Sequence, residues 1–239
     1  MTRHHRPLAL VTGGSAGLGR ALVHALHDRG WAVVTDGRDA VRLAEATRDL
    51  DDVEAIPGDV ADAAHRHELV EAVRRINPDH GLDLLVHNAS TLGPLPMPHL
   101  RHLETDSLAA IWDTNAGAPH ALTRRLVDDL TVADGILLSL SSDAAVQHYP
   151  GWGGYGAAKA ALDHLTLTFG EETGVRAYVV DPGDMDTQMH RDAEPGEDLS
   201  HLPKPETVVP HLLALVDRRP TPGRYRAADV APSLTGVAS

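Results

Sequence analysis

The sequence has no cysteine, few aromatic residues and only two lysines among its 239 residues. Without cysteine there can be no disulfide, no thiolate nucleophile and no cysteine-based zinc site. Aromatic residues make up 3% of the chain, so Ala, Leu and Val must fill most of the core. No apolar run is long enough to span a membrane, and the apolar segment after the basic start is too short for a signal peptide. We therefore expect a cytoplasmic protein.

Acidic residues outnumber basic ones, and the formal net charge is -13. Such a charge disfavours nucleic acid and anionic membranes as partners. A small-molecule substrate remains, and any site for a phosphorylated ligand must be locally positive. The sixteen histidines include the pairs His65/His67 and His99/His102. Neither pair has a second pair at ligand spacing, so no metal site is predicted.

Apolar segments of strand length alternate with amphipathic segments of helical length. Strands are expected at residues 8–12, 32–36, 53–56, 82–87, 135–141, 175–180 and 223–227. Helices are expected at residues 18–29, 40–50, 63–76, 103–130 (interrupted near Pro119), 155–171 and 206–217. Continuous apolar strands indicate a parallel sheet covered on both faces. The pattern predicts one α/β domain over residues 1–239, with a doubly wound parallel sheet of about seven strands flanked by helices.

Ligands of such sheets bind at the carboxyl ends of the strands. Two long loops follow strand ends, at residues 90–100 and 184–205. The first is rich in proline and the second is polar and acidic. Long loops in this position often cover an active site. We expect both to border a ligand pocket, although ordinary surface loops are the alternative.

A glycine-rich turn, Thr12-Gly-Gly-Ser-Ala-Gly-Leu-Gly19, joins the first predicted strand to the first predicted helix. Glycines let the backbone turn sharply and approach a pyrophosphate closely. The helix N-terminus then offers N–H donors and a positive dipole. In this context the turn predicts a dinucleotide site.

The second predicted strand ends in Asp36, followed by Gly37 and Arg38. An acid at this place binds the adenosine ribose hydroxyls of NAD, whereas an arginine accommodates the 2′-phosphate of NADP. Asp36 and Arg38 share a face because side chains alternate along a strand. Spacing alone leaves both cofactors open.

One of the two lysines, Lys159, stands four residues after Tyr155. On a helix this spacing places both side chains on one face. The ammonium would then lower the pKa of the phenol. A phenol tuned toward neutrality can pass a proton at physiological pH. The alternative is an idle pair on a surface helix.

Together these motifs resemble the short-chain dehydrogenase/reductase family over roughly residues 7–228. The resemblance implies a Rossmann-like fold and a nicotinamide cofactor. The residues that match the family's catalytic set are Asn115, Ser142, Tyr155 and Lys159. The residues that match its cofactor-binding motifs are Gly13, Ser15, Ala16, Gly17, Leu18, Gly19, Arg38, Asp59, Val60, Asn88, Ala89, Tyr155, Lys159, Pro182, Gly183 and Thr187.

The family's NAD-selecting acid usually stands where this chain has Gly37, and Arg38 matches NADP-preferring members. NADP(H) is therefore favoured, and Asp36 keeps NAD(H) possible. The chain departs from the family pattern at three places. His87 stands where asparagine is common, Ser90 replaces a glycine near the expected nicotinamide ribose, and Asp181 precedes Pro182 where a neutral residue is commoner.

The resemblance implies hydride transfer between NADP(H) and a carbonyl or alcohol carbon, as in a ketoreductase. Tyr155 would exchange a proton with the substrate oxygen, and Ser142 would hold that oxygen in place. Lys159 would lower the pKa of Tyr155 and bind the ribose hydroxyls. Asn115 would connect Lys159 to water.

The residues expected by position to line the substrate pocket are mostly apolar. They are Leu92, His148, Trp152, Met185 and Met189, with Leu95, Met97 and His190 as further candidates. This set suggests a hydrophobic or cyclic ketone rather than a sugar or a phosphorylated compound. Usage rich in arginine and alanine and poor in lysine is typical of GC-rich bacterial genomes, where such ketoreductases are numerous.

Two alternatives from other classes stay open. The same fold could use a bound nucleotide structurally in a non-redox biosynthetic step, or could act as a non-catalytic sensor. The intact Tyr155 and Lys159 favour the redox enzyme. The resemblance also implies a homotetramer or homodimer, with the helices at residues 103–130 and 155–171 at the interface.

Overall fold

The computed structural model describes residues 6–233, in which strands and helices alternate. The strands are β1 (Leu8–Val11), β2 (Ala32–Gly37), β3 (Val53–Pro57), β4 (Leu84–His87), β5 (Ile136–Leu140), β6 (Arg176–Asp181) and β7 (Gly223–Arg226). The α-helices are α1 (Gly17–Asp28), α2 (Ala40–Thr47), α3 (Ala63–Ile76), α4 (Thr105–Trp112), α5 (Ala118–Val132), α6 (Gly153–Thr173), α7 (Gln188–Ala193) and α8 (Pro205–Arg218). Each predicted strand has a counterpart whose ends lie within two residues of the predicted ones.

Within residues 6–233 all seven strands join one parallel sheet, in the order β3-β2-β1-β4-β5-β6-β7. The predicted doubly wound parallel sheet is confirmed. The order reverses between β1 and β4, because the chain starts in the middle of the sheet and winds outward in both directions. In such sheets the carboxyl ends of the two strands at the reversal border the ligand crevice.

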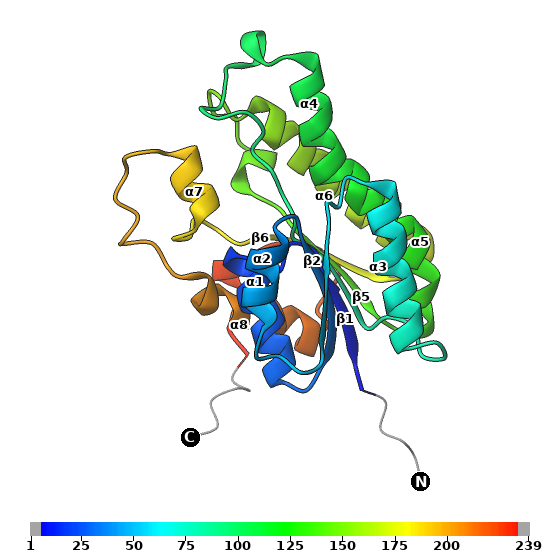
Figure 1. Ribbon diagram of the computed structural model, residues 1–239. Helices are drawn as coiled ribbons and strands as arrows, with labels where there is room; N and C mark the ends of the chain where they lie inside the picture. The colour runs from blue at the N-terminus through cyan, green and yellow to red at the C-terminus, as the bar shows by residue number, and fades with distance from the viewer. Residues whose placement is uncertain (1–5, 234–239) are drawn as a thin grey trace.

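Helices cover both faces of the sheet (Figure 1). On one face α1 and α8 pack against the strands, and on the other α3 and α5 do so. Consecutive residues of β1 point to opposite faces of the sheet. Ala9 and Val11 belong to the hydrophobic core under α1 and α8, called the first core below, and Leu8 and Leu10 belong to the second core, under α3 and α5. This two-sided burial explains why the strands read as unbroken apolar runs.

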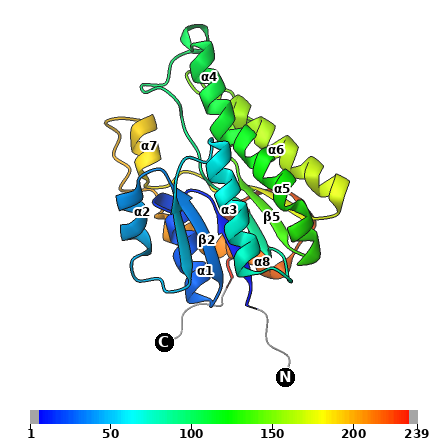
Figure 2. The same cartoon turned by 45° about the vertical axis from the view of Figure 1, so that its right-hand side comes forward.

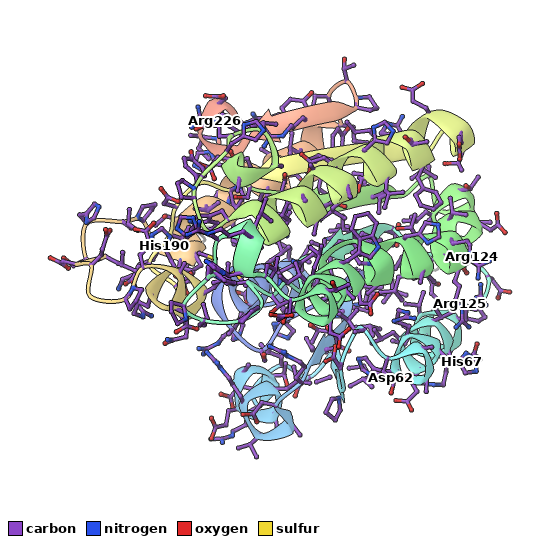
Figure 3. The ribbon with its side chains drawn as sticks, turned by 90° about the horizontal axis from the view of Figure 1, so that it is seen from above. Asp62, His67, Arg124, Arg125, His190 and Arg226 are labelled. Carbon is purple, nitrogen blue, oxygen red and sulfur yellow. The ribbon has the colours of Figure 1, made fainter. Side chains whose placement is uncertain are left out.

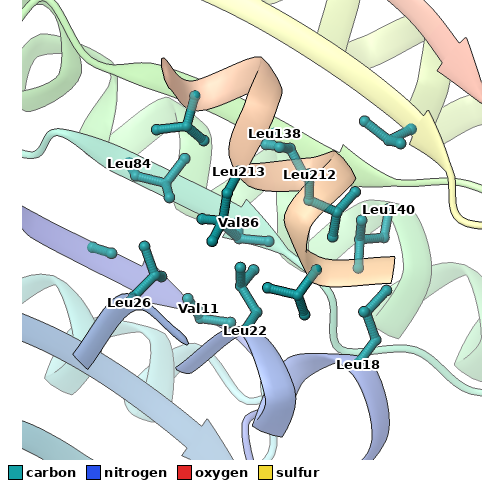
Figure 4. Packing of buried hydrophobic residues seen from close by; sticks show 14 of the residues in the cluster. Val11, Leu18, Leu22, Leu26, Leu84, Val86, Leu138, Leu140, Leu212 and Leu213 are labelled. Carbon is teal, nitrogen blue, oxygen red and sulfur yellow. The ribbon is translucent and has the colours of Figure 1, made fainter. Parts of the chain in front are cut away.

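The first core is built almost wholly from aliphatic side chains (Figure 4). Leu22 and Leu26 of α1 meet Val11 of β1, and Leu212 of α8 closes the layer. Tyr178 on β6 is a fully buried aromatic residue, and its hydroxyl donates to the carbonyl oxygen of Pro220 at 2.8 Å. Small aliphatic side chains thus fill the interior, as the scarcity of aromatic residues requires.

The long helix expected at residues 103–130 is divided into two. α4 ends at Trp112, a π turn spans Asp113–Gly117, and α5 begins at Ala118. Pro119 lies in the first turn of α5, where a missing N–H costs nothing, so the break falls before the proline. In Figure 2, α4 and α5 run beside α6 and reach past the sheet.

The acidic loop expected at residues 184–205 contains the short helix α7. Thr187 caps α7 by accepting a hydrogen bond from the backbone N–H of His190 at 3.2 Å. Six residues are too few to show a helical period in the sequence, which is why α7 was not predicted. Among the helices between residues 6 and 233, none combines the length and apolar character needed to cross a bilayer.

We expect Leu22→Ala to lower the free energy of unfolding by about 2–5 kcal/mol, because it leaves a cavity between α1 and the sheet. Leu22 is 1% exposed. Urea denaturation followed by circular dichroism measures the loss. Val41→Ala is the matched control, since Val41 is 69% exposed and a surface change costs within about 0.5 kcal/mol. Equal losses in the two variants would contradict this account of the core.

Candidate active site

The glycine-rich turn after β1 is wound so tightly that side chains would not fit. Gly13 has a φ of +76°, a conformation that favours glycine. A Cβ atom on Gly19 would lie 2.3 Å from the carbonyl oxygen of Gly13. α1 then begins at Gly17, and its N-cap Ala16 has no side chain to bond the first N–H groups. Those donors are left for an anionic ligand.

Thr12 and Asn88 tie this turn to the end of β4. The hydroxyl oxygen of Thr12 accepts hydrogen bonds from the backbone N–H groups of Asn88 at 3.0 Å and Ala89 at 3.1 Å. In return, Nδ2 of Asn88 donates to the carbonyl oxygens of Thr12 at 2.8 Å and Gly13 at 3.1 Å. The two strands at the reversal of the sheet are therefore joined where the crevice begins.

Asp36 lies beneath the turn rather than beside the ribose position. Its carboxylate is 1% exposed and accepts a hydrogen bond from the backbone N–H of Gly13 at 2.6 Å. The other oxygen bonds Nε2 of the buried His65 at 3.0 Å. Spacing alone left Asp36 and Arg38 both open as cofactor-selecting residues, and the resemblance favoured Arg38. Asp36 supports the turn, whereas Arg38 is exposed.

An open hollow of about 580 Å³ adjoins the turn. It is lined by Ser15, Arg38, Asp39 and Arg42. Asp39 caps α2 by accepting from the N–H groups of Val41 and Arg42, each at 3.0 Å. Two guanidinium groups therefore face the region beyond β2. Arg42 was not among the predicted residues, since no motif marks it.

The other predicted cofactor residues lie at the carboxyl ends of neighbouring strands. After β3, Asp59 is exposed and accepts a hydrogen bond from the N–H of Ala61 at 2.9 Å, while Val60 is buried. Beyond β6, the N–H of Gly183 donates to Asp181 at 3.0 Å. Thr187 packs near Gly17, where an added Cβ atom would lie 3.7 Å from the Thr187 methyl. The segment after β6 thus passes beside the glycine turn.

Tyr155 and Lys159 lie together on α6, and both are buried. The Lys159 ammonium is 5.6 Å from the Tyr155 ring centroid and donates to the carbonyl oxygen of Leu140 at 2.8 Å. Burial raises the pKa of Tyr155 to about 12, while the hydroxyls of Ser90 and Ser142 act to lower it. The sequence predicted a lowered pKa for this phenol. In the structure burial outweighs that effect, because no solvent reaches the oxygen to stabilise a phenolate.

Ser90 and Ser142 follow β4 and β5, and both act to lower the pKa of Tyr155. Ser142 follows β5, donates to Asp143 at 3.0 Å and accepts from the N–H of Ala144 at 3.1 Å. Ser90 donates to Oδ1 of Asn115 at 3.0 Å. The Ser90 hydroxyl thus links the segment after β4 to Asn115, and its expected place near the nicotinamide ribose stays a prediction.

Asn115 is fully buried in the π turn between α4 and α5. Its Oδ1 also accepts from the N–H of Thr91 at 2.9 Å, and its Nδ2 donates to the carbonyl oxygen of Thr91 at 2.8 Å. The side chain therefore holds the segment after β4 in place. These three hydrogen bonds all go to that segment, and the expected link between Asn115 and Lys159 stays a prediction.

His87, at the end of β4, is a buried imidazole beside the site. Its Nε2 bonds the hydroxyl of Thr123 at 2.7 Å. Burial, with a further contribution from the charge of Lys159, lowers the pKa of His87 to about 3. The ring is therefore neutral near Lys159 at physiological pH. Within residues 6–233 no three histidine or carboxylate side chains gather closely enough to hold a metal ion.

A small apolar cluster surrounds Tyr155. It consists of Leu92, Met97, Ala144, Trp152, Met189 and Ala193. The Trp152 ring stands edge-on to that of Tyr155, with centroids 5.7 Å apart. Of the other predicted pocket residues, Met185 packs against the first core, His148 is exposed and Leu95 is 49% exposed. His190 is half-buried on α7, which stands to one side when the molecule is seen from above (Figure 3).

Residues 7–198 match the family model described as short chain dehydrogenase. Serine 3-dehydrogenase from Agrobacterium fabrum is 32% identical over 189 residues, which cover 75% of this chain and 72% of that protein. A short-chain dehydrogenase structure from Pseudomonas syringae has a TM-score of 0.85 at 30% identity, over 92% of this chain and 94% of that one. A short-chain dehydrogenase from Escherichia coli, complexed with NADPH, has a TM-score of 0.83 at 26% identity, over 92% and 96% of the two chains.

We expect Asp36→Ala to be less stable than the native protein by about 1–3 kcal/mol, because it leaves the buried His65 without an acceptor and the Gly13 N–H without a partner. Urea denaturation measures the difference. Asp36→Asn keeps an oxygen for Gly13 and an N–H₂ group for the other His65 tautomer, so it should lose less. The interpretation fails if the two variants are equally stable.

Proposed function

Because the chain belongs to the short-chain dehydrogenase/reductase family, we propose that it transfers hydride between NADP(H) and the carbonyl or alcohol carbon of a small apolar substrate. Family membership makes the protein an NAD(P)-dependent oxidoreductase. The observation that carries the finer proposal is that Tyr155 and Lys159 lie near Ser142 at the carboxyl end of β5. Proton donor, cation and hydroxyl then lie at the edge of the sheet where the dinucleotide turn also ends.

The residues around the turn fit a dinucleotide. A Cβ atom on Gly13 or Gly19 would collide with Asn88 or the neighbouring backbone, so glycine at these places lets the chain turn tightly into α1. The first turn of α1 supplies N–H donors for a pyrophosphate. Bound NADPH would supply the hydride, and the protein's own groups would bind, orient and exchange the proton.

Two features favour NADP(H) over NAD(H). Arg38 and Arg42 line the hollow beyond β2, and guanidinium groups bind a phosphate with two parallel hydrogen bonds. Asp36, the acid that kept NAD possible, is engaged with Gly13 and His65. Its oxygens are therefore unavailable to ribose hydroxyls. The NADPH complex of the Escherichia coli relative supports the same choice.

Tyr155 acts as the proton donor to the substrate oxygen during reduction. With its pKa raised to about 12 by burial, the phenol keeps its proton at neutral pH and is ready to give it up to a developing alkoxide. Ser142 holds the substrate oxygen in place, and Lys159 binds ribose hydroxyls and supplies positive charge. Asn115 acts indirectly, by fixing the segment that carries Ser90.

The apolar cluster around Tyr155 favours a hydrophobic or cyclic ketone as substrate. Serine, which the name of the Agrobacterium relative mentions, is small and carries one positive and one negative group. Side chains such as Leu92, Trp152 and Met189 offer it no charged partner, so we infer a different substrate for this chain. The cytoplasmic location and the homotetramer or homodimer stay predictions from the sequence.

Replacing Tyr155 with Phe should lower turnover by at least about 10²-fold, since the proton donor is lost. NADPH oxidation, followed by its absorbance with a panel of cyclic and aromatic ketones, measures this, and NADP+ reduction with L-serine is the polar comparison. Quenching of Trp152 fluorescence by NADPH should persist in Tyr155→Phe, which shows that the cofactor still binds. Near-native turnover in Tyr155→Phe would contradict the assignment of Tyr155 as proton donor. If the native protein binds NADPH but turns over no ketone, the sensor or non-redox alternative is favoured.

Arg38→Gln and Arg42→Gln should each raise the dissociation constant for NADPH about tenfold or more, while leaving that for NADH nearly unchanged. The reason is the loss of a charged hydrogen bond to the 2′-phosphate. Fluorescence titration with both cofactors measures the ratio. Arg48→Gln is the matched control, because Arg48 is exposed at the far end of α2. If both cofactors weaken equally, or Arg48→Gln behaves like Arg38→Gln, these arginines do not select the phosphate.

A further inference from the structure

Lys159 is a buried cation, and such a group is unstable unless other groups compensate its charge. It is 2% exposed. The carbonyl oxygen of Leu140 accepts one of its hydrogen bonds, and the Tyr155 ring lies below it. These are neutral partners. Burial lowers the pKa of Lys159 to about 8, with Asp163 acting in the opposite direction.

Asp163 stands one helical turn after Lys159 on α6, so the two side chains share a face. It is 9% exposed. Burial raises the pKa of its carboxyl group, and the charges of Arg224 and Lys159 act to lower it. No motif of the sequence marked Asp163, because the catalytic pattern ends at Lys159.

Arg224 holds this carboxylate from the neighbouring strand β7. Its Nε donates to Oδ2 of Asp163 at 3.0 Å, and its Nη2 donates to the carbonyl oxygen of Ser142 at 2.8 Å. Asp181 of β6 lies 3.9 Å from the same guanidinium. Arg224 therefore holds both the Asp163 carboxylate and the backbone of Ser142 in place.

The charged and titratable groups around Lys159 come from four elements. Tyr155 and Asp163 lie on α6, His87 on β4, Asp181 on β6 and Arg224 on β7. His87 and Tyr155 are neutral at physiological pH, since their pKa values are about 3 and about 12. Asp181 lies 3.9 Å from Nη2 of Arg224, which partly offsets its charge, and Asp163 is the acid that acts to raise the pKa of Lys159. Asp163 is thus the acid whose charge acts most directly on Lys159.

We propose that Asp163, held in place by Arg224, is a positioning residue that keeps Lys159 protonated in the cofactor site. It touches neither substrate nor cofactor and works through the lysine. Its importance for turnover rests on the proposed function, in which Lys159 must be charged. The alternative is a purely structural role, in which the Asp163–Arg224 ion pair only holds α6 against β7.

The chain's two lysines make a direct test possible. We expect an NMR pH titration of the full protein, labelled with ¹³C at lysine Cε, to show two titrating signals. Lys204→Arg assigns them, because Lys204 is exposed outside the site. Asp163→Asn should lower the midpoint of the Lys159 signal by about one unit, since a neighbouring opposite charge is removed. A purely structural tie would not shift this midpoint.

Glu171→Gln is the matched control on the same helix, since Glu171 is exposed, and it should leave the Lys159 midpoint unchanged. Asp163→Ser is a second neutral variant in case Asp163→Asn does not fold, as judged by circular dichroism. A Lys159 midpoint in a folded neutral variant within about 0.3 units of the native value overturns the proposal. The titration needs neither cofactor nor turnover, so a failed ketone panel would refute the proposed function and leave this result standing.

Discussion

The junction between β1 and β4 is the constraint on which the rest of the site depends. The Thr12 hydroxyl accepts hydrogen bonds from the backbone N–H groups of Asn88 and Ala89, which begin the segment after β4. The glycine turn and that segment therefore cannot move independently. Two residues further on, Ser90 reaches Asn115, whose side chain also binds Thr91. The dinucleotide turn is thereby connected through hydrogen bonds to the surroundings of Tyr155. A parallel sheet makes this possible because its carboxyl ends all meet at one edge.

Burial shifts the pKa values of Tyr155 and Lys159 in opposite directions. The pKa of Tyr155 rises to about 12, and that of Lys159 falls to about 8. Both shifts favour the neutral form, as expected where water is excluded. A phenol that keeps its proton suits the reduction of a carbonyl. The lysine, in contrast, needs help to stay charged, and the carboxylate of Asp163 lies where it can give that help.

Most of the fold could be predicted from the sequence, because each strand is a continuous apolar run between helical segments. The glycine turn and the Tyr155/Lys159 pair could likewise be located, since their chemistry demands fixed spacing. The sequence predicts the interruption near Pro119, but neither its form as a π turn nor the short helix α7. Each depends on packing against distant segments, and six residues or fewer carry no clear period. For the same reason Met185, a neighbour of Met189 in the sequence, packs into a different core.

Asp36 shows why residue type and position are insufficient to assign a role. From the sequence, Asp36 and Arg38 share a strand face and both suit a ribose. The deciding partner is His65, 29 residues away on α3, and no local pattern reveals it. The imidazole and the Gly13 N–H bind the Asp36 carboxylate, while Arg38 and Arg42 line the hollow beyond β2 together with Ser15 and Asp39. In the proposed function, the cofactor preference depends on what Asp36 already binds. In the proposed role of Asp163, the charge of Lys159 likewise depends on an acid one helical turn beyond the motif.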